Sequence, residues 1–398
     1  MNQILIEKAS GEDIFVLMQT EWKLLFTKTN CAPFLAWEWL SVWFKWFGAD
    51  RTPFILKAYR ENQLIGILPL CWQEKKILGM RLQRIGFIGE TQGGADYLDL
   101  IAKSEDKAEI LSAIFDFLKT ETSFDVLCLE NLKSDSETVE FLQNAGQSAK
   151  NPRLFYSDLT SAVCPQINLS EGWEVVLKHS KRASNFKRRL KQLEKMADFE
   201  FRSVTSPDET GAAFERFYRL HEKRWANDGG SELSGHPRLV SFQRDLVATL
   251  ANSGTLRFDE LWVEGECRAS VYGLDNGKTF YYYNAGYELE WSSKSVGLVL
   301  IGLSVKNAIA RGNLMYDFLR GDEIYKFDWA NQTAELVTAN LSRRTISTLA
   351  NQGINQSLLA FRKISKSILP SRLAEKVKNY RRTWNRNYQL SDLESEKK

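Results

Sequence analysis

Cysteine, histidine and proline are scarce in this chain of 398 residues. The cysteines are odd in number, widely spaced and include no Cys-x-x-Cys pair, which argues against a disulfide scaffold and favours a reducing compartment. No histidine has the spacing to another histidine or to a cysteine that zinc ligands show, so the sequence predicts no metal centre. The residues concerned are Cys31, Cys71, Cys128, Cys164, Cys267, His179, His221 and His236.

Long apolar runs and a strong net charge are missing as well. No segment approaches the ~20 apolar residues that cross a bilayer, and residues 1–8 lack the basic start and apolar core of a signal peptide. The formal net charge of +3 is too small to indicate a nucleic-acid-binding protein. We therefore expect a cytoplasmic protein with no DNA partner.

The basic residues gather near the C-terminal end. Residues 355–390 contain nine lysines and arginines and one acid, Glu375. Apolar residues recur at helical spacing through the same segment, which predicts a basic amphipathic tail over 351–398. Such a tail either makes a peripheral contact with the anionic inner face of a membrane or packs back on the rest of the chain.

The length and the order of the predicted elements indicate two domains. A chain with 43% hydrophobic residues can bury a large core, and a hairpin, a strand, a helix and a strand are predicted in the same order in each half. We predict an α/β (α+β) fold of two similar halves, 1–150 and 166–350, each a mixed twisted sheet flanked by helices. Gly146, Pro152 and Pro165 interrupt the pattern between about 144 and 170, where the junction is expected.

A tryptophan-rich segment over 34–47 marks the first half. Trp39, Trp43 and Trp46 share one helical face, and we expect this helix to be buried or to form the wall of an acceptor groove. The other elements predicted for this half are helices over 14–26 and 107–119, a hairpin of 54–59 with 64–70, and strands over 4–6, 95–101 and 124–129.

The stretch 256–329 carries the clearest local signals. Three strands, a loop, one helix and a last strand follow one another. The helix begins after Lys294 and three serines, near Gly297, and its apolar positions recur as far as Ile309. The first N–H groups of a helix have no partner within it, and the helix dipole is positive there. This helix start therefore predicts a site for a phosphate or diphosphate group.

The same stretch resembles the acyl-CoA site of the GNAT N-acetyltransferase superfamily, in which a loop and a helix N-terminus hold the diphosphate of coenzyme A. Tyr316-Asp317-Phe318 followed by Tyr325-Lys326 resembles the GNAT-like proteins named for bacterial cellulose biosynthesis, which are relatives of the Fem aminoacyltransferases. The resemblance implies tandem GNAT-like halves, the second of which binds acyl-CoA, most simply acetyl-CoA. It also implies acyl transfer to an amine or hydroxyl of a sugar, polysaccharide or cell-envelope precursor.

The resemblance also implies roles for individual residues. Asp317 would be the base or would orient the acceptor, and Tyr282 would give a proton to the leaving thiolate. The charged residues after Leu319 would fix the acceptor, or would form only a solvated ion-pair loop; His221 is expected to be structural. The implied cofactor contacts are Tyr283, Lys294, Ser295, Gly297 and Leu298, and the implied acceptor contacts are Arg224, Trp225, Arg320, Glu323 and Lys326.

Two other functions stay open. Residues 178–197 are predicted to form one amphipathic helix whose basic face is either only solvated or grips an anionic acceptor or tRNA, as in a Fem-like aminoacyl-tRNA-dependent transferase. GNAT loops usually carry two glycines around a basic residue, whereas Gly297 stands alone, which fits a non-catalytic binding module. The turn at 227–230 would free the loop after it to act as a lid.

Overall fold

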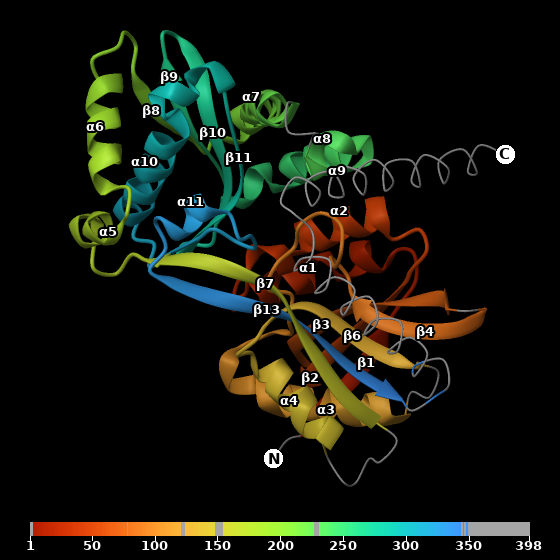
Figure 1. Ribbon diagram of the computed structural model, residues 1–398. Helices are drawn as coiled ribbons and strands as arrows, with labels where there is room; N and C mark the ends of the chain where they lie inside the picture. The colour runs from red at the N-terminus through yellow and green to blue at the C-terminus, as the bar shows by residue number, and fades with distance from the viewer. Residues whose placement is uncertain are drawn as a thin grey trace, which may run out of the picture.

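The computed structural model describes residues 3–77, 79–120, 124–147, 154–226, 231–343, 345 and 348. Figure 1 shows two halves joined by long strands through the middle of the molecule. The predicted tail over 351–398 and the predicted lid turn at 227–230 lie outside the described residues.

The elements follow the chain in two series. The first is β1 (Leu5–Ala9), α1 (Ile14–Phe26), η1 (Pro33–Leu35), α2 (Trp37–Phe47), β2 (Thr52–Arg60), β3 (Gln63–Ile77), β4 (Met80–Phe87), β5 (Ile101–Ala102), α3 (Ser104–Thr120), β6 (Val126–Lys133) and α4 (Glu137–Gln147). The second is β7 (Leu154–Asn168), α5 (Trp173–His179), α6 (Ala183–Leu193), β8 (Glu200–Val204), α7 (Pro207–Ala226), α8 (Glu232–Gly235), α9 (Pro237–Leu250), η2 (Ala251–Ser253), β9 (Leu256–Val263), β10 (Glu266–Asp275), β11 (Thr279–Tyr287), η3 (Leu289–Lys294), α10 (Val296–Ala310), β12 (Met315–Asp317), α11 (Ile324–Phe327) and β13 (Gln332–Arg343).

The described strands form one mixed sheet that runs through both halves, in the order β1-β2-β3-β4-β6-β13-β7-β12-β11-β10-β9-β8, with β5 beside β3. The long strands β7 and β13 pair antiparallel at its centre (Figure 1). β13 follows the whole second series and yet pairs with β6 of the first. The junction expected over 144–170 is thus largely strand β7, and the last strand completes the sheet of the first half.

The same arrangement of strands occurs twice. In the first half, the antiparallel strands β2, β3 and β4 lead through α3 to β6, which is parallel to β4. In the second half, β9, β10 and β11 lead through α10 to β12, which is parallel to β11. This repetition confirms the predicted α/β fold of two similar halves, each with a mixed sheet flanked by helices.

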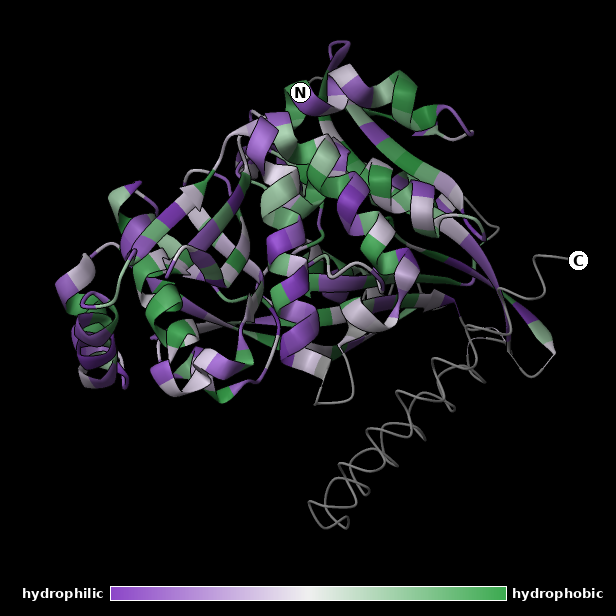
Figure 2. Ribbon diagram, turned by 90° about the horizontal axis from the view of Figure 1, so that it is seen from above, coloured by the Kyte–Doolittle hydropathy of each residue, from purple (hydrophilic) through white to green (hydrophobic). Residues whose placement is uncertain are grey.

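Two apolar cores lie on opposite faces of the second-half sheet. Successive side chains of a strand point to opposite faces, so Tyr272 packs with Phe217 of α7 on one face and Val271 packs under α10 on the other. The first of these cores continues through α9 and α2 into the first half. Figure 2 shows hydrophobic residues on the strands and on the inner sides of the helices.

The tryptophan-rich helix α2 lies in this shared core. Trp39 and Trp43 are fully buried. The indole N–H of Trp43 donates to the carbonyl of Gln92 at 2.7 Å, and that of Trp46 donates to Asp245 of α9 at 2.8 Å. The helix therefore packs between the halves, which confirms the expectation that it is buried.

The strand predicted over 95–101 is wrong, because only Ile101–Ala102 is a strand. The carboxylate of Asp96 accepts a hydrogen bond from the backbone N–H of Arg320 in the other half. Tyr97 has a left-handed backbone, with φ of 57°. These tertiary contacts hold the segment as a loop although its apolar residues favour a strand.

The single helix predicted over 178–197 is also wrong. α5 ends at His179 and α6 begins at Ala183, because Ser180 between them is extended, with ψ of 128°. The hydroxyl of Ser180 donates to the carbonyl of Asp328 at 3.2 Å, and the N–H of Lys181 donates to the same carbonyl at 2.9 Å. This break holds the start of α6 beside the end of α11.

Candidate functional site

Strands β11 and β12 part beside the predicted cofactor loop. Their parallel ladder has three registered pairs and ends at Tyr281 opposite Asp317. β11 continues to Tyr287, and over this length its other edge stays paired with β10. Among the described strands, the backbone of β11 beyond Tyr281 therefore has a neighbour on one side only. Ala285 is already bonded, through its N–H to Asn284 and its carbonyl to His221, so a ligand would meet the other main-chain groups of this edge.

Helix α10 begins at the end of this parted strand. Ser295 precedes it in a left-handed conformation, with φ of 59°, and no side chain caps the helix. The first N–H groups, those of Val296, Gly297 and Leu298, have no acceptor within the helix. Lys294 is exposed, and Ser295, Gly297 and Leu298 are half-buried, so the helix entry is open to solvent.

Gly297 brings the helix entry against β11. A Cβ atom built on Gly297 would lie 3.4 Å from the ring of Tyr287. The guanidinium carbon of Arg224 lies 5.3 Å from the same ring and 5.0 Å from the ring of Trp225. The structure thus brings Arg224 and Gly297 against Tyr287, with Trp225 beside Arg224, at the end of the part of β11 that has left β12.

Tyr282 and Tyr283 point to opposite faces of β11. The Tyr282 ring is buried and lies 5.4 Å from Phe318 and 6.5 Å from Tyr325. Burial raises the pKa of the Tyr282 hydroxyl well above its ordinary value, so the hydroxyl keeps its proton at neutral pH. The Tyr283 hydroxyl donates to the carbonyl of Gly93 at 2.6 Å, so a cofactor contact by Tyr283 would come from its backbone.

Asp317 lies in a buried polar network that joins the two halves. Its side chain is 1% exposed. The Tyr97 hydroxyl and the Gln166 amide each donate to Oδ2 at 2.7 Å, and the N–H of Leu319 donates to Oδ1 at 2.7 Å. Burial raises the pKa of the carboxyl to about 6, against the three donors, which favour the charged form.

The charged loop after β12 is held by its own contacts. Arg320 pairs with Asp96 and donates to the carbonyl of Ala95 at 2.7 Å. Lys326 is 5% exposed, lies 3.0 Å from Glu323 and donates to the carbonyl of Arg320 at 2.8 Å. These bonds show an ordered loop beside the parting, and the acceptor contacts implied for its residues stay a prediction.

Both ring nitrogens of His221 are hydrogen-bonded within the protein, as in a structural histidine. Nδ1 donates to the carbonyl of Ala285 at 3.1 Å, and Nε2 accepts from the Ser231 hydroxyl at 2.8 Å. Burial lowers the pKa of the ring, so the neutral form with both nitrogens bonded is favoured.

Sequence reasoning missed the residues that the first half adds to this region. From the first half, Asp96 and Tyr97 reach Arg320 and Asp317 because the loop before β5 lies beside β12 in the fold. Gln166 of β7, which pairs with β12, was missed as well. The one signal for them is the acid Asp96 within an apolar stretch. No group of three or more metal-ligating side chains is found in the part of the chain that the structure describes. Of the helices described, none is long and apolar enough to cross a membrane.

Comparison with known proteins agrees with this geometry. Residues 180–327 match the family model described as the acetyltransferase (GNAT) domain. The matched stretch contains α10, β11, β12 and the parting between the strands, and it covers less than half of the chain. Among curated protein sequences, none matches.

Three solved structures are similar in fold. FemX has a TM-score of 0.57 and 11% identity, over 84% of this chain and 96% of FemX. A conserved protein of unknown function from Bacteroides thetaiotaomicron VPI-5482 has a TM-score of 0.52 and 10% identity, over 85% of this chain and 100% of that one. The C-terminal domain (DUF2156) of a proposed lysylphosphatidylglycerol synthetase from Agrobacterium fabrum has a TM-score of 0.51 and 9% identity, over 87% and 96%.

These likenesses extend over most of each chain, so both halves take part in the shared fold. At such low identity they show the fold alone. Residues 180–327, in the second half, thus match a GNAT domain model, and the fold of the whole chain is similar to that of FemX. The type named for cellulose biosynthesis stays an expectation.

Proposed function

We propose that this chain is an acyl-CoA-dependent acyltransferase that moves an acyl group, most simply acetyl, to an amine or hydroxyl of a sugar, polysaccharide or cell-envelope precursor. The observation that carries the proposal is the junction of an uncapped helix entry, at Val296, with a strand that has no strand neighbour on one edge beyond Tyr281. The helix entry suits a diphosphate, and the strand edge suits the extended pantetheine chain.

The backbone supplies most of the proposed cofactor contacts. The N–H groups of Val296, Gly297 and Leu298 would bind the diphosphate, with the charge of Lys294 beside them. Gly297 leaves the N–H groups of the helix entry accessible, because a larger residue would place side-chain atoms over them. The free edge of β11 would hydrogen-bond the pantetheine amides.

The reaction needs a proton for the leaving thiolate. The acceptor nitrogen or oxygen attacks the thioester carbonyl carbon, the carbon–sulfur bond breaks, and the thiolate takes a proton. Tyr282 is placed for this step because its ring lies where β11 has left β12, and its hydroxyl carries a proton at neutral pH. The acceptor gives up one proton, so Tyr282 regains its own proton through solvent.

Asp317 would act on the acceptor through Tyr97. Because Asp317 is 1% exposed, it does not face an open site directly. The half-buried Tyr97 hydroxyl donates to it at 2.7 Å and would transmit its charge. In this proposal Tyr97 takes the acceptor proton as its own hydroxyl proton moves to the Asp317 carboxylate, or water takes the acceptor proton and Asp317 only positions Tyr97.

Thiol release from acetyl-CoA, measured with amine and hydroxyl sugars as acceptors, tests the proposal. We expect Tyr282→Phe to lower kcat by roughly 100-fold, the usual size of a lost general acid, with little change in KM. Tyr281→Phe is the matched control, since Tyr281 is equally buried but points to the other face of β11. Equal activity of wild type and Tyr282→Phe would remove Tyr282 from the mechanism.

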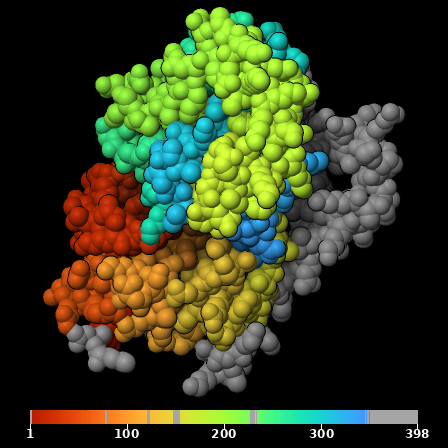
Figure 3. Space-filling view, turned by 90° about the vertical axis from the view of Figure 1, so that its left-hand side faces the viewer, coloured from red at the N-terminus to blue at the C-terminus, as the bar shows by residue number. Residues whose placement is uncertain are grey.

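One observation favours a second function. The face of α6 that carries Lys187, Arg188 and Lys191 is exposed, and Figure 3 shows this segment as a yellow-green ridge on the surface. Such a face fits an RNA backbone, as an aminoacyl-tRNA donor would present. Activity that needs aminoacyl-tRNA, falls steeply with salt and ignores acetyl-CoA would establish this function instead.

We also propose a cytoplasmic location at the inner face of the membrane. The five cysteines are free thiols, which supports a reducing compartment such as the cytoplasm. The acceptor would then be an intermediate made on the inner side of the membrane, and the basic tail over 351–398 would bring the enzyme to that surface.

A further inference from the structure

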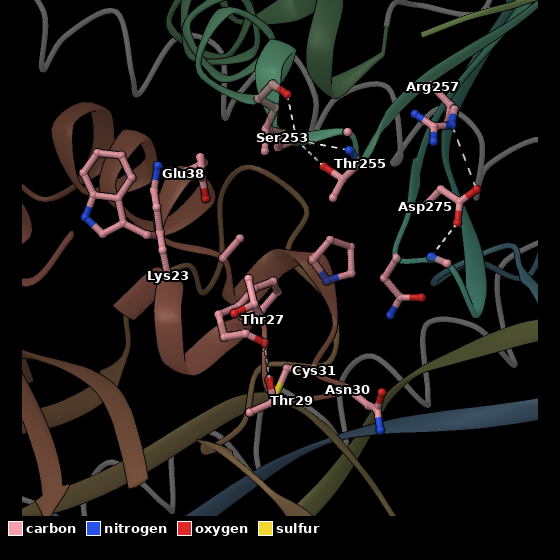
Figure 4. A pocket seen from close by; sticks show the side chains of 18 of the residues that line it. Lys23, Thr27, Thr29, Asn30, Cys31, Glu38, Ser253, Thr255, Arg257 and Asp275 are labelled. Atoms are coloured by element: carbon pink, nitrogen blue, oxygen red, sulfur yellow. Dashed lines mark hydrogen bonds and ion pairs between the residues drawn. The ribbon is translucent and has the colours of Figure 1, made fainter. Parts of the chain in front are cut away.

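A cavity opens between the two halves, at the end of α10 away from the helix entry. Its volume is about 720 Å³, within the range that holds small organic ligands. α10 has 15 residues and rises ~1.5 Å per residue, so this cavity is separated from the helix entry by roughly 22 Å. Figure 4 shows its walls: α1 and the loop after it, with Thr29 and Asn30, face Thr255 and Arg257 of the second half.

The second-half wall carries more positive than negative charge. Arg257, Arg311 and Asp275 all line the cavity. Nε of Arg311 lies 3.0 Å from Asp275 Oδ2, and Nε of Arg257 lies 4.0 Å from the same oxygen. Two guanidinium groups therefore share one carboxylate. That carboxylate is further occupied by the Asn313 amide and the N–H of Gly277, each at 2.8 Å.

Several polar atoms of this wall have no hydrogen-bond partner within the described residues. They are Nε of Arg257, Nη1 and Nη2 of Arg311, and Oδ1 of Asn313, all buried. Asn313 is 3% exposed and lies on the cavity wall. Buried polar groups are nearly always bonded, so unpartnered ones around a cavity point to a ligand. Burial also lowers the pKa of Arg257, which shows that its charge is poorly compensated.

The opposite wall does not offset this charge. Lys23 and Glu38 line it and pair with each other at 2.8 Å. The rim adds hydroxyl groups, those of Ser253 and Thr255, which lie 2.6 Å apart. Asp259 is the nearby buried acid of the same sheet, but it lies outside the lining and is held by Ser203 and Ser304.

We propose that this cavity binds a small hydroxylated organic anion, with its phosphate or carboxylate group at Arg257 and Arg311. Guanidinium N–H groups match anionic oxygens in geometry, and a ligand hydroxyl would serve Oδ1 of Asn313. Both halves line the cavity, so the bound anion fastens one half to the other. The site is independent of the acyl-CoA site.

Thermal unfolding of the full chain tests the proposal. The probes are glucose 6-phosphate and glucuronate, with glucose as the uncharged control and inorganic phosphate as the bare anion. A ligand that binds only the folded chain raises Tm in proportion to the logarithm of its concentration above Kd. We expect one or both sugar anions to raise Tm, more than glucose and more than inorganic phosphate do; the stronger of the two identifies the anionic group.

Three variants locate the effect. Arg257→Gln should weaken the response at least 10-fold in apparent Kd, and it leaves the close bonds of Asp275 to Arg311 and Asn313 in place. Asn30→Trp, at an exposed position of the lining, should block the cavity without altering its charge. Lys278→Gln removes an exposed charge outside the lining and should respond like wild type.

The proposal is overturned by either of two results. One is that neither sugar anion raises Tm beyond glucose and inorganic phosphate at millimolar concentration. The other is an equal rise in wild type, Arg257→Gln and Asn30→Trp, which would place the anion elsewhere on the surface.

Discussion

Arg320 and Asp96, 224 residues apart in the chain, form an ion pair that joins the two halves beside the candidate site. Asp96 is 1% exposed and accepts from both the side chain and the backbone N–H of Arg320. Arg320 also donates to the carbonyl of Ala95. The loop after β12 is therefore fixed from the first half, and the site depends on both halves being packed together.

Removing the acid of this pair should destabilise the protein. In Asp96→Asn the guanidinium group of Arg320, whose side chain is 38% exposed, loses the counter-charge of a buried carboxylate, so we expect the free energy of unfolding to fall by about 1 to 2 kcal/mol. Urea unfolding measures it. Arg202→Gln, which breaks an exposed pair with Glu200, is the control and should cost under about 0.5 kcal/mol. If both variants lost the same free energy of unfolding, the Asp96 pair would stabilise the protein no more than an exposed ion pair does.

Asp317 should make stability fall as pH rises from about 4 to 6. Its pKa is raised from 3.8 to about 6 in the folded chain by burial. Between these values the folded state holds a proton that the unfolded state has lost, so ionisation costs stability as pH rises. The full effect of a shift of this size is about 3 kcal/mol.

The comparison of wild type with Asp317→Asn isolates this effect, since their other carboxyl groups are the same. We expect the free energy of unfolding of wild type, relative to the variant, to fall across pH 4 to 6 and to stay level above pH 7. A difference that does not change with pH would show that Asp317 titrates at its ordinary pKa.

Replacing two glycines by alanine should change stability in opposite directions, because one lies against α7 and the other faces open space. A Cβ atom on Gly286 would lie 2.4 Å from the backbone nitrogen of His221, so Gly286→Ala must push α7 from the strand and should cost about 1 to 3 kcal/mol. A Cβ atom on the helical Gly211 meets nothing within 4 Å, and Gly211→Ala should stabilise by about 0.5 to 1 kcal/mol. Chemical unfolding of both variants checks the contact, which is absent if Gly286→Ala is neutral.

Local sequence patterns predicted the elements whose buried face is set by the spacing of their own apolar residues. The helix expected over 14–26 is α1, with the same bounds, because its apolar face alone decides where it lies. The hairpin of 54–59 with 64–70 is β2 and β3 for the same reason. The helix entry near Gly297 was predicted as well, since a loop, a glycine and an apolar helix are all visible in sequence.

Features that depend on distant partners could not be predicted. The apolar residues over 95–101 favour a strand, but Asp96 and Tyr97 are held by Arg320 and Asp317 of the other half. The insertion of β13 between β6 and β7 leaves no local trace, because pairing with either neighbour needs only an extended segment. The charge excess around Arg257 and Arg311 is visible only once strands and helix ends meet.

The central claim is that acyl-CoA binds at the entry of α10, and titration calorimetry with acetyl-CoA tests it most directly. We expect the full chain to bind one acetyl-CoA. Gly297→Val should weaken binding at least 10-fold by covering the helix entry, and Lys294→Ala should weaken it by less. Lys306→Ala, an exposed lysine further along the same helix, should bind like wild type. No binding to wild type, or unchanged binding to Gly297→Val and Lys294→Ala, would contradict the account.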